Sequence, residues 1–318
     1  MGCLFIGSVD IPSHDVWNSL FSGEVGKESW RFIVSESRLP AAITALLSGG
    51  ALALAGLILQ TTFDNPLAGP SILGISTGAG LGVAIIILAV GGLATIWGQT
   101  AIILAAIAGA MAVLIVLLLL SSLVKSQVML LITGILVGYL SSSAITLLNF
   151  FAGSENVHSY MVWGLGSFNN MTWDFLPEYA VLLVILMAIC FLYIKPMNAC
   201  LLGPVYAESV GINIKRSRNG LIVISGVLTA VVTAGCGPIG FIGLVVPHIA
   251  RLTVGSTNHI KLMPVTIITG CGVGTLCQLL SVLPGTMGII PINAITPAIG
   301  VPIIIYIIVK RRKISYFN

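Results

Sequence analysis

Residues 97–124 read WGQTAIILAAIAGAMAVLIVLLLLSSLV, a run without one charged residue. An α-helix needs about 20 apolar residues to cross the hydrocarbon core of a bilayer, so this run is long enough to span it. The run is apolar on every side, whereas the strands of a membrane barrel alternate apolar and polar residues. It therefore predicts a transmembrane helix.

Similar apolar runs recur along the rest of the chain. Their approximate ranges are 39–62, 71–91, 128–152, 176–195, 219–236, 238–254, 262–284 and 288–309. The runs at 219–236 and 238–254 are nearly continuous, and only Gly235, Gly237 and Pro238 separate them. Together the runs predict an all-α protein, a polytopic transmembrane helical bundle with nine visible spans that forms one domain over residues 1–318.

The composition excludes several classes of protein. Only 8% of the residues are charged and 57% are hydrophobic, against about 25% charged in ordinary globular chains. A soluble enzyme, a nucleic-acid-binding protein and a disordered scaffold each need a polar surface that this chain lacks. The lipid bilayer is therefore the expected partner, nucleic acid is not, and the net charge of +4 says nothing about acidic partners.

Cysteine and histidine give no sign of a metal or cofactor site. The six cysteines lie mostly within apolar runs without a CxxC pair, which fits neither a disulfide framework nor a zinc site. His248 stands between Pro247 and Ile249 without a second ligand at helical spacing, so we interpret it as a hydrogen-bonded packing residue. We expect no metal, cofactor or catalytic residue in this chain.

Basic residues mark one side of the bundle. Lys125, Lys195, Lys215, Arg216, Arg218, Arg251, Lys261, Lys310, Arg311, Arg312 and Lys313 fall in every second connection or at its edge. Lysine and arginine near a span resist translocation, so this side is predicted to be cytoplasmic. The C-terminus is then inside and the N-terminus, as given, outside.

An external N-terminus needs a span before it, yet Met1–Gly7 is too short to cross a bilayer. We therefore expect residues 1–38 to be the outer end of a truncated first helix, at Met1–Ile6, followed by an external segment. The parent architecture would have ten spans with both termini inside.

Glycine gathers in the first two spans, at Gly49, Gly50, Gly56, Gly74, Gly78, Gly80 and Gly82. Small residues let helices approach closely where lipid provides no hydrophobic drive for association. One interpretation is tight packing, and the other is that these glycines let helices slide and tilt during transport. The sequence leaves both open.

Several motifs, collinear from about Gly7 to the C-terminus, identify a family by resemblance. They are QTTFDNPLA at 60–68, LGISTGA at 73–79, WGLGSF at 163–168, PMN at 196–198, GPIGFIGLVVPHIAR at 237–251 and NAITPAIGVP at 293–302. Read together they resemble the FecCD-like permease subunits of binding-protein-dependent ABC importers for iron-siderophores, haem and vitamin B12.

The resemblance implies a transport subunit that does no chemistry itself, in a bacterial or archaeal inner membrane. Two copies would form the pathway as a homodimer, two cytoplasmic ABC ATPase subunits would use ATP to drive it, and an external binding protein would deliver the substrate. The expected substrate is an iron chelate, haem or a corrinoid.

The resemblance also assigns a cytoplasmic coupling loop, residues 196–218, which would dock on the ATPase. The coupling residues would be Pro204, Val205, Tyr206, Ala207, Glu208, Ser209, Val210 and Gly211. Pro204 suits the first turn of a short helix and Gly211 its end. The loop departs from the family pattern at Pro204, Val205 and Glu208. The alternative is a basic loop that only sets topology.

Two further sites follow from the resemblance. A cytoplasmic gate would involve Asn65 and Leu67, with Gln127 and Val128 on the next inside turn. An ordinary Asn-Pro corner is the alternative for the first of these turns. Arg38 would meet an acidic group on the binding protein, or would pair with Glu36 instead.

Other functions stay open as alternatives. The same scaffold would serve molybdate or another metal complex. An ion-coupled secondary transporter would need ionisable residues near the bilayer midplane, and none of the acidic residues falls centrally in a span. An intramembrane enzyme would need a constellation of catalytic side chains that no span carries.

Overall fold

The computed structural model describes residues 2–7, 9–21, 25–90, 98–124, 126–283 and 289–310, and this part of the chain is helical without a strand. The α-helices are α1 (Gly2–Phe5), α2 (Ser13–Phe21), α3 (Glu28–Phe32), α4 (Leu39–Thr62), α5 (Ile75–Ala84), α6 (Gly98–Leu123), α7 (Gln127–Phe151), α8 (Ser154–Gly164), α9 (Leu176–Cys190), α10 (Ile194–Cys200), α11 (Pro204–Ser209), α12 (Ile214–Cys236), α13 (Ile242–Val254), α14 (His259–Ser281) and α15 (Ile292–Lys310). Two π-helical turns, η1 (Ile33–Arg38) and η2 (Ile85–Ala89), and two 3₁₀ turns, η3 (Phe168–Asn170) and η4 (Phe191–Tyr193), adjoin them.

The predicted all-α transmembrane bundle is confirmed. Six described helices are long and apolar enough to cross a membrane: Glu28–Thr62, Gly98–Leu123, Gln127–Phe151, Leu176–Cys200, Ile214–Cys236 and His259–Ser281. Three shorter apolar helices are Ile75–Ala89, Ile242–Val254 and Ile292–Tyr306. Each of the nine predicted runs coincides with one of these helices. Of the basic residues used to assign the sides, Lys125 and residues 311–313 lie outside the described part of the chain.

The first span begins earlier than predicted, at Glu28 rather than residue 39. The charged residues of this segment suggest a loop, but the chain continues as helix through α3 and η1 into α4. Pro40, which has no backbone N–H to donate, stands at the start of α4 directly after the π-helical turn. A π-helical register shifts the hydrogen bonds by one residue, which lets the helix pass a proline without a break.

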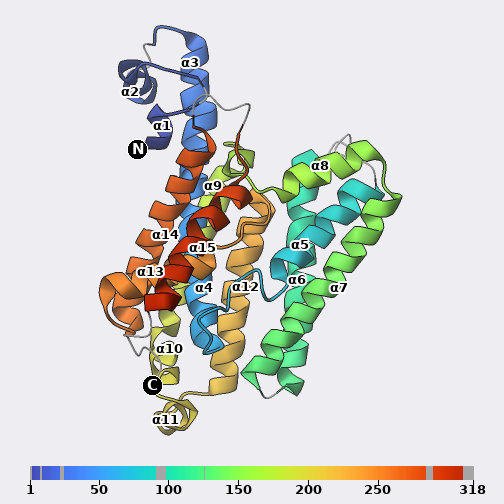
Figure 1. Cartoon of the computed structure of the whole chain (residues 1–318), viewed down its shortest axis with the longest axis vertical. Helices are drawn as coiled ribbons and strands as arrows, with labels where there is room; N and C mark the ends of the chain where they lie inside the picture. Colours follow the sequence, from blue (N-terminus) through green and yellow to red (C-terminus); the bar gives the residue numbers. More distant parts are fainter. Residues whose placement is uncertain are drawn as a thin grey trace.

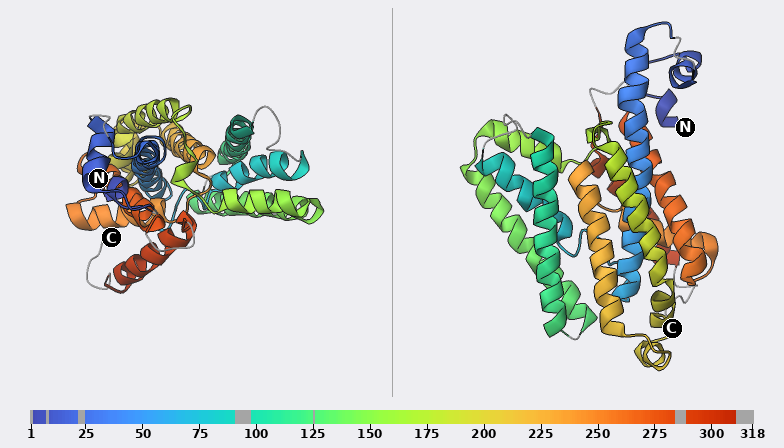
Figure 2. Two further views of the ribbon diagram at one scale, coloured as in Figure 1. Left: turned by 90° about the horizontal axis from the view of Figure 1, so that it is seen from above. Right: turned by 180° about the vertical axis from the view of Figure 1, so that it is seen from behind.

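The bundle has two groups of helices that share α12 (Figure 1). One apolar core joins α4, α9, α12, α13, α14 and α15, and the other joins α5, α6 and α7 to the opposite side of α12. Figure 2 shows the same division from above and from behind. We call the end where α11 lies the α11 end and the opposite end, with α2, the α2 end (Figure 1). A small apolar cluster of Leu4, Ile11, Val16 and Val34 holds the first helices together at the α2 end.

Glycine contacts draw the long helices together. A Cβ atom built on Gly49 of α4 would lie 2.3 Å from the carbonyl oxygen of Gly270 in α14. One built on Gly109 of α6 would lie 2.1 Å from the carbonyl oxygen of Gly78 in α5. These helices touch backbone to backbone, so tight packing is confirmed for Gly49, Gly56, Gly74, Gly78 and Gly82, while sliding during transport stays a prediction.

Two breaks in the helices shape the interior. Gly237 has φ 74° and Phe241 has φ 66°, so the chain reverses between α12 and α13 within five residues. Gly74 has φ 74° directly before α5, where a Cβ atom would lie 2.9 Å from the carbonyl oxygen of Gly134. Only glycine combines this backbone conformation with so close a neighbour. Both breaks adjoin the cavity described next.

Candidate functional site

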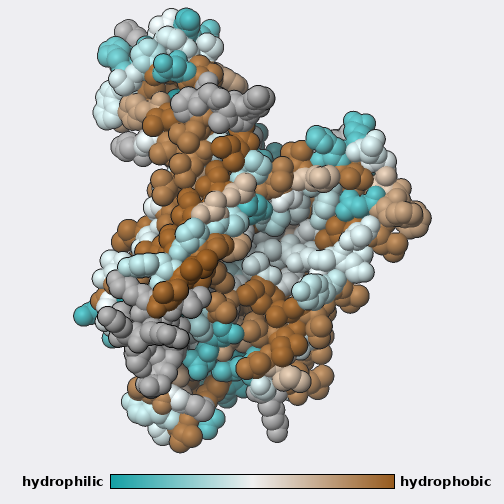
Figure 3. Space-filling view, viewed as in Figure 1, coloured by the Kyte–Doolittle hydropathy of each residue, from teal (hydrophilic) through white to brown (hydrophobic). Residues whose placement is uncertain are grey.

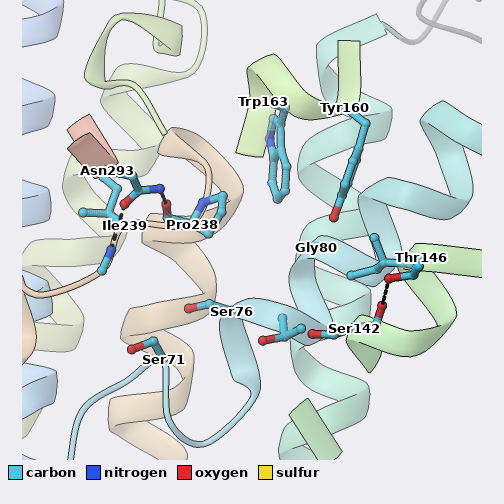
Figure 4. A pocket seen from close by; sticks show the side chains of 13 residues that line it. Ser71, Ser76, Gly80, Ser142, Thr146, Tyr160, Trp163, Pro238, Ile239 and Asn293 are labelled. Atoms are coloured by element: carbon cyan, nitrogen blue, oxygen red, sulfur yellow. Dashed lines mark hydrogen bonds between the residues drawn. The ribbon is translucent and has the colours of Figure 1, made fainter. Parts of the chain in front are cut away.

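A cavity of about 500 Å³ lies between the two groups of helices. Its lining residues come from the α4–α5 connection, α5, α7, α8, the α12–α13 turn and α15: Ser71, Ser76, Thr77, Gly80, Ser142, Ile145, Thr146, Tyr160, Trp163, Pro238, Ile239, Gly240 and Asn293. Figure 4 shows these side chains. In the space-filling view the centre of the molecule between the two groups is pale, and apolar side chains flank it (Figure 3).

The lining combines hydroxyl groups with apolar surface. Hydroxyl groups of Ser71, Ser76, Ser142 and Thr146 form its floor, Thr77 adds a fifth hydroxyl to the lining, and none of the described residues that line it is charged. The rings of Tyr160 and Trp163 stack with their centroids 6.0 Å apart, at an interplanar angle of 28°. Such a wall offers hydrogen bonds and aromatic faces without a fixed charge, so it is suited to a bulky ligand that is held weakly.

Asn293, in the first turn of α15, ties together the α12–α13 turn and the end of α8 at the edge of the cavity. Its Nδ2 donates to the carbonyl oxygen of Pro238 at 2.6 Å and to that of Gly164 at 3.3 Å. Its Oδ1 accepts from the backbone N–H of Gly240 at 3.1 Å. One side chain from α15 therefore fixes the α12–α13 turn, as Figure 4 shows, and also the end of α8.

Backbone hydrogen bonds support the same junction. The N–H of Ser167 donates to the carbonyl oxygen of Cys236 at 2.8 Å, and that of Ile292 donates to Gly166 at 3.4 Å. Chain segments that end helices leave backbone groups unpaired, and in a membrane these groups must find partners within the protein. Asn293 belongs to a motif of the sequence. Its role becomes visible only in the structure, where the end of α8, the α12–α13 turn and the start of α15 meet.

The predicted coupling loop, residues 196–218, contains the short helix that its sequence predicts. Helix α11 begins at Pro204 and ends at Ser209, and Gly211 follows with φ 82°. Val205 of α11 is 81% exposed, and Val210, directly after the helix, is 52% exposed. Ala207 is fully buried beneath them, so it supports the helix rather than forming its outer face.

The residues predicted to form a gate lie on two separate turns. Asn65 Oδ1 accepts from the N–H of Leu67 at 2.9 Å, which is the Asx turn expected of an Asn-Pro corner. Leu67 is 50% exposed. Gln127 and Val128 are exposed in the first turn of α7. The gate itself stays a prediction, because it depends on what meets these exposed side chains.

Arg38 has partners within the chain. Its side chain is 9% exposed. The guanidinium donates to the carbonyl oxygen of Leu4 at 2.8 Å and also to that of Val9. These contacts bind the N-terminal segment to the start of α4, and an acidic partner would have to displace them.

His248 donates from Nε2 to the carbonyl oxygen of Pro66 at 2.9 Å, as expected of a packing histidine. Among the described residues, no group of three or more histidine, cysteine, aspartate or glutamate side chains is placed to hold a metal ion.

Comparison with known proteins gives a consistent result. The sequence model of the FecCD transport family matches residues 1–310. The vitamin B12 import system permease protein BtuC of Escherichia coli (strain HS) is 35% identical over 280 residues, 88% of this chain and 84% of that protein. The BtuC protein of Shigella boydii serotype 18 is similar to the same extent.

Two solved structures share the fold. A metal-chelate type ABC transporter in an inward-facing conformation is similar with a TM-score of 0.83 at 27% identity, and the match covers 97% of this chain and 95% of that chain. PsaBC from Streptococcus pneumoniae in complex with Fab has a TM-score of 0.53 at 15% identity over 85% and 90% of the two chains, which supports the fold alone.

Proposed function

Because this chain belongs to the FecCD transport family and is an ABC importer permease of that type, we propose that it carries a corrinoid of the vitamin B12 type across the inner membrane. The permease is a non-catalytic component, and ATP hydrolysis belongs to a partner ATPase. The relatives at 35% identity are vitamin B12 import permeases. Ferric siderophores, haem and other metal chelates are the competing substrates.

The observation that carries the proposal is the uncharged cavity with its hydroxyl floor and its Tyr160–Trp163 wall. A corrinoid is a large macrocycle with a flat face and a polar rim. Aromatic rings suit the face, and hydroxyl groups suit the rim. Without a fixed charge the cavity has no strong point of attachment, so the ligand would be free to leave on the other side.

The size of the cavity supports a homodimer. One chain supplies about 500 Å³, which is modest for a corrinoid. A second copy across a two-fold axis would present the same wall, and the two would enclose about 1,000 Å³, at the upper end of small-molecule sites. We place the α11 end in the cytoplasm, because Lys215 and Arg216 at the start of α12 lie there. There α11 would dock on the ATPase, and an external binding protein would deliver the substrate at the α2 end.

Transport by the reconstituted complex tests the substrate. Proteoliposomes would contain the permease and its cognate ATPase, with the cognate binding protein outside and ATP inside. We expect ATP-dependent accumulation of labelled cyanocobalamin, and little accumulation of haem or of a ferric siderophore. Accumulation of one of the iron compounds in place of cyanocobalamin would contradict the corrinoid assignment. The assignment of the complex as an importer would still hold.

Two adjacent serines on α7 test the cavity. Ser142 lines it, and its exposed neighbour Ser143 does not. Ser142→Trp should fill the pathway and reduce accumulation strongly, whereas Ser143→Trp should leave it near wild type. Equal effects of the two substitutions would show that substrate does not pass through this cavity.

A further inference from the structure

We propose that His259 is a positioning residue that links the coupling loop to the turn at the end of α4, so that movement of the loop is transmitted to residues 63–68. The inference rests on the proposed function, because it concerns how ATP hydrolysis would reach the pathway. The argument starts from a chain of hydrogen bonds at the α11 end.

His259 is the first residue of α14, and its side chain is only 1% exposed. Its Nδ1 lies 2.8 Å from Asn198 Oδ1, and its backbone N–H donates to the same oxygen at 2.9 Å. Its Nε2 lies 2.9 Å from Thr61 Oγ1. The imidazole therefore joins α10, whose last residues begin the coupling loop, to the last turn of α4.

The hydrogen bonds around Asn198 determine which ring nitrogen of His259 carries the proton. Its Oδ1 accepts from a backbone N–H, and its Nδ2 donates to Asn258 Oδ1 at 3.0 Å, so the two amide atoms cannot be exchanged. Nδ1 of His259 must then carry a hydrogen to donate to Asn198. In the neutral ring Nε2 is an acceptor for the hydroxyl of Thr61, whose single proton it shares with the carbonyl oxygen of Leu57, 3.0 Å from Thr61 Oγ1.

Thr61 lies directly before the turn at residues 63–68, to which the movement would be transmitted. Its neighbour Gln60 is 2% exposed, and the Gln60 carbonyl oxygen accepts from the N–H of Asn65 at 3.1 Å. The Gln60 side chain donates to the carbonyl oxygen of Leu244 at 3.1 Å and accepts from Arg251. Within the same turn, Pro66 is held by His248. Displacement of Thr61 would therefore move the first residues of the turn relative to α13.

The centre of the link is buried: His259 is 1% exposed, and Thr61 and Asn198 at its two ends are half-buried. A buried polar group that loses its partner costs more free energy than the hydrogen bond contributes, so breaking the link at either ring nitrogen is unfavourable. Both ring nitrogens are engaged, and a shift of α10 must either carry Thr61 with it or leave one nitrogen unpaired. Intermediate positions are disfavoured, which is what transmission between two sites requires.

Two substitutions at one position separate the two bonds. In His259→Asn the amide nitrogen takes the place of Nδ1, so the bond to Asn198 is kept and the bond to Thr61 is lost. In His259→Gln the amide reaches the place of Nε2, so the bond to Thr61 is kept and the Nδ1 bond is lost. Thr61→Val removes the Thr61–His259 bond from the side of α4, together with the bond from Thr61 to the carbonyl oxygen of Leu57 in its own helix. Thr266→Val, at a buried threonine of α14 bonded only within its own helix, is the matched control.

Hydrogen exchange of the full chain in nanodiscs is the first measurement. Cutting the Thr61 bond should speed the exchange of amides at 63–68 about tenfold, the change expected for one buried hydrogen bond. His259→Asn, Thr61→Val and the double variant should show the same increase, because all three cut the same bond. Thr61→Ser restores the hydroxyl and should return exchange to the wild-type rate, and Thr266→Val should leave it unchanged.

The second measurement is the number of ATP molecules hydrolysed for each cyanocobalamin transported by the reconstituted complex. His259→Asn, His259→Gln and Thr61→Val should raise this ratio severalfold while assembly with the ATPase stays intact. Unchanged exchange in His259→Asn and Thr61→Val would overturn the proposal. Faster exchange with an unchanged ATP ratio would also overturn it, because the bonds would then hold the turn without transmitting movement.

The two proposals fail in different ways. If the wild-type complex does not accumulate cyanocobalamin, the assignment of the substrate fails. The ATP ratio is then measured with the iron compound that does accumulate, and if none does, the proposed function fails and the link to coupling fails with it.

Discussion

Gly56 of α4 and Gly243 of α13 are in backbone contact, and a Cβ atom built on Gly56 would lie 1.7 Å from the carbonyl oxygen of Gly243. Below 3.0 Å such an atom cannot be accommodated unless its neighbour moves, and here the neighbour is backbone. The contact brings α13 against the half of α4 that leads to the Asn-Pro turn. Helices in a membrane gain most of their association from such close approach.

Gly56→Ala should therefore separate α4 from α13. Overpacking in a protein core costs roughly 1–3 kcal/mol. We expect the free energy of unfolding to fall by at least this amount, because main-chain atoms have no alternative rotamer. Gly272→Ala in α14 is the control, since nothing lies within 4 Å of its added Cβ atom and alanine favours a helix by about 1 kcal/mol. Thermal unfolding of the purified protein in detergent checks both. A Gly56→Ala protein as stable as Gly272→Ala would contradict the contact.

Asn293→Ala should loosen the junction at the cavity. It leaves the carbonyl oxygens of Pro238 and Gly164 and the N–H of Gly240 without this partner, at a cost of about 1–3 kcal/mol. Hydrogen exchange should then rise at 237–241 and at 164–167 together. Asn170→Ala, at an exposed position, should leave both segments unchanged. An increase confined to one segment would show that Asn293 does not tie them together.

Val205→Asp should weaken binding of the cognate ATPase and leave the fold of the permease unaltered. Val205 is 81% exposed, so the charge is hydrated in the free protein and would be desolvated only in a complex. Val205→Thr keeps the shape and is the control. Co-purification of the two subunits, with the melting temperature of the permease alone, checks the prediction. Normal co-purification of the aspartate variant would place the docking surface elsewhere.

If the proposed homodimer forms, Leu67→Cys should crosslink to its own copy when the cytoplasmic side is closed. Leu67 is 50% exposed at the tip of the Asn-Pro turn, and a residue near a two-fold axis meets its own copy. The experiment uses a background without the six native cysteines, and non-reducing gels in several nucleotide states report the crosslink. If no state gives a crosslink, the turn lies away from the axis and is an ordinary corner.

Local signals were enough to predict part of this protein. Uninterrupted apolar runs such as 97–124 predicted the helices, because length and hydrophobicity alone decide whether a segment spans a bilayer. Gly237 and Pro238 predicted the break between α12 and α13. Pro204 and Gly211 predicted the short helix α11 from the chemistry of its two ends.

Only the tertiary structure decided which side chains act together. Ala207 and Arg38 read as surface residues in the sequence, yet Ala207 is buried and Arg38 is bonded to Leu4 and Val9. Thr61, Asn198 and His259 stand far apart along the chain and form one hydrogen-bonded link. The physical reason is that apolarity and backbone preference belong to a residue and its immediate neighbours. A buried polar group must find a partner wherever the packing of the helices brings one.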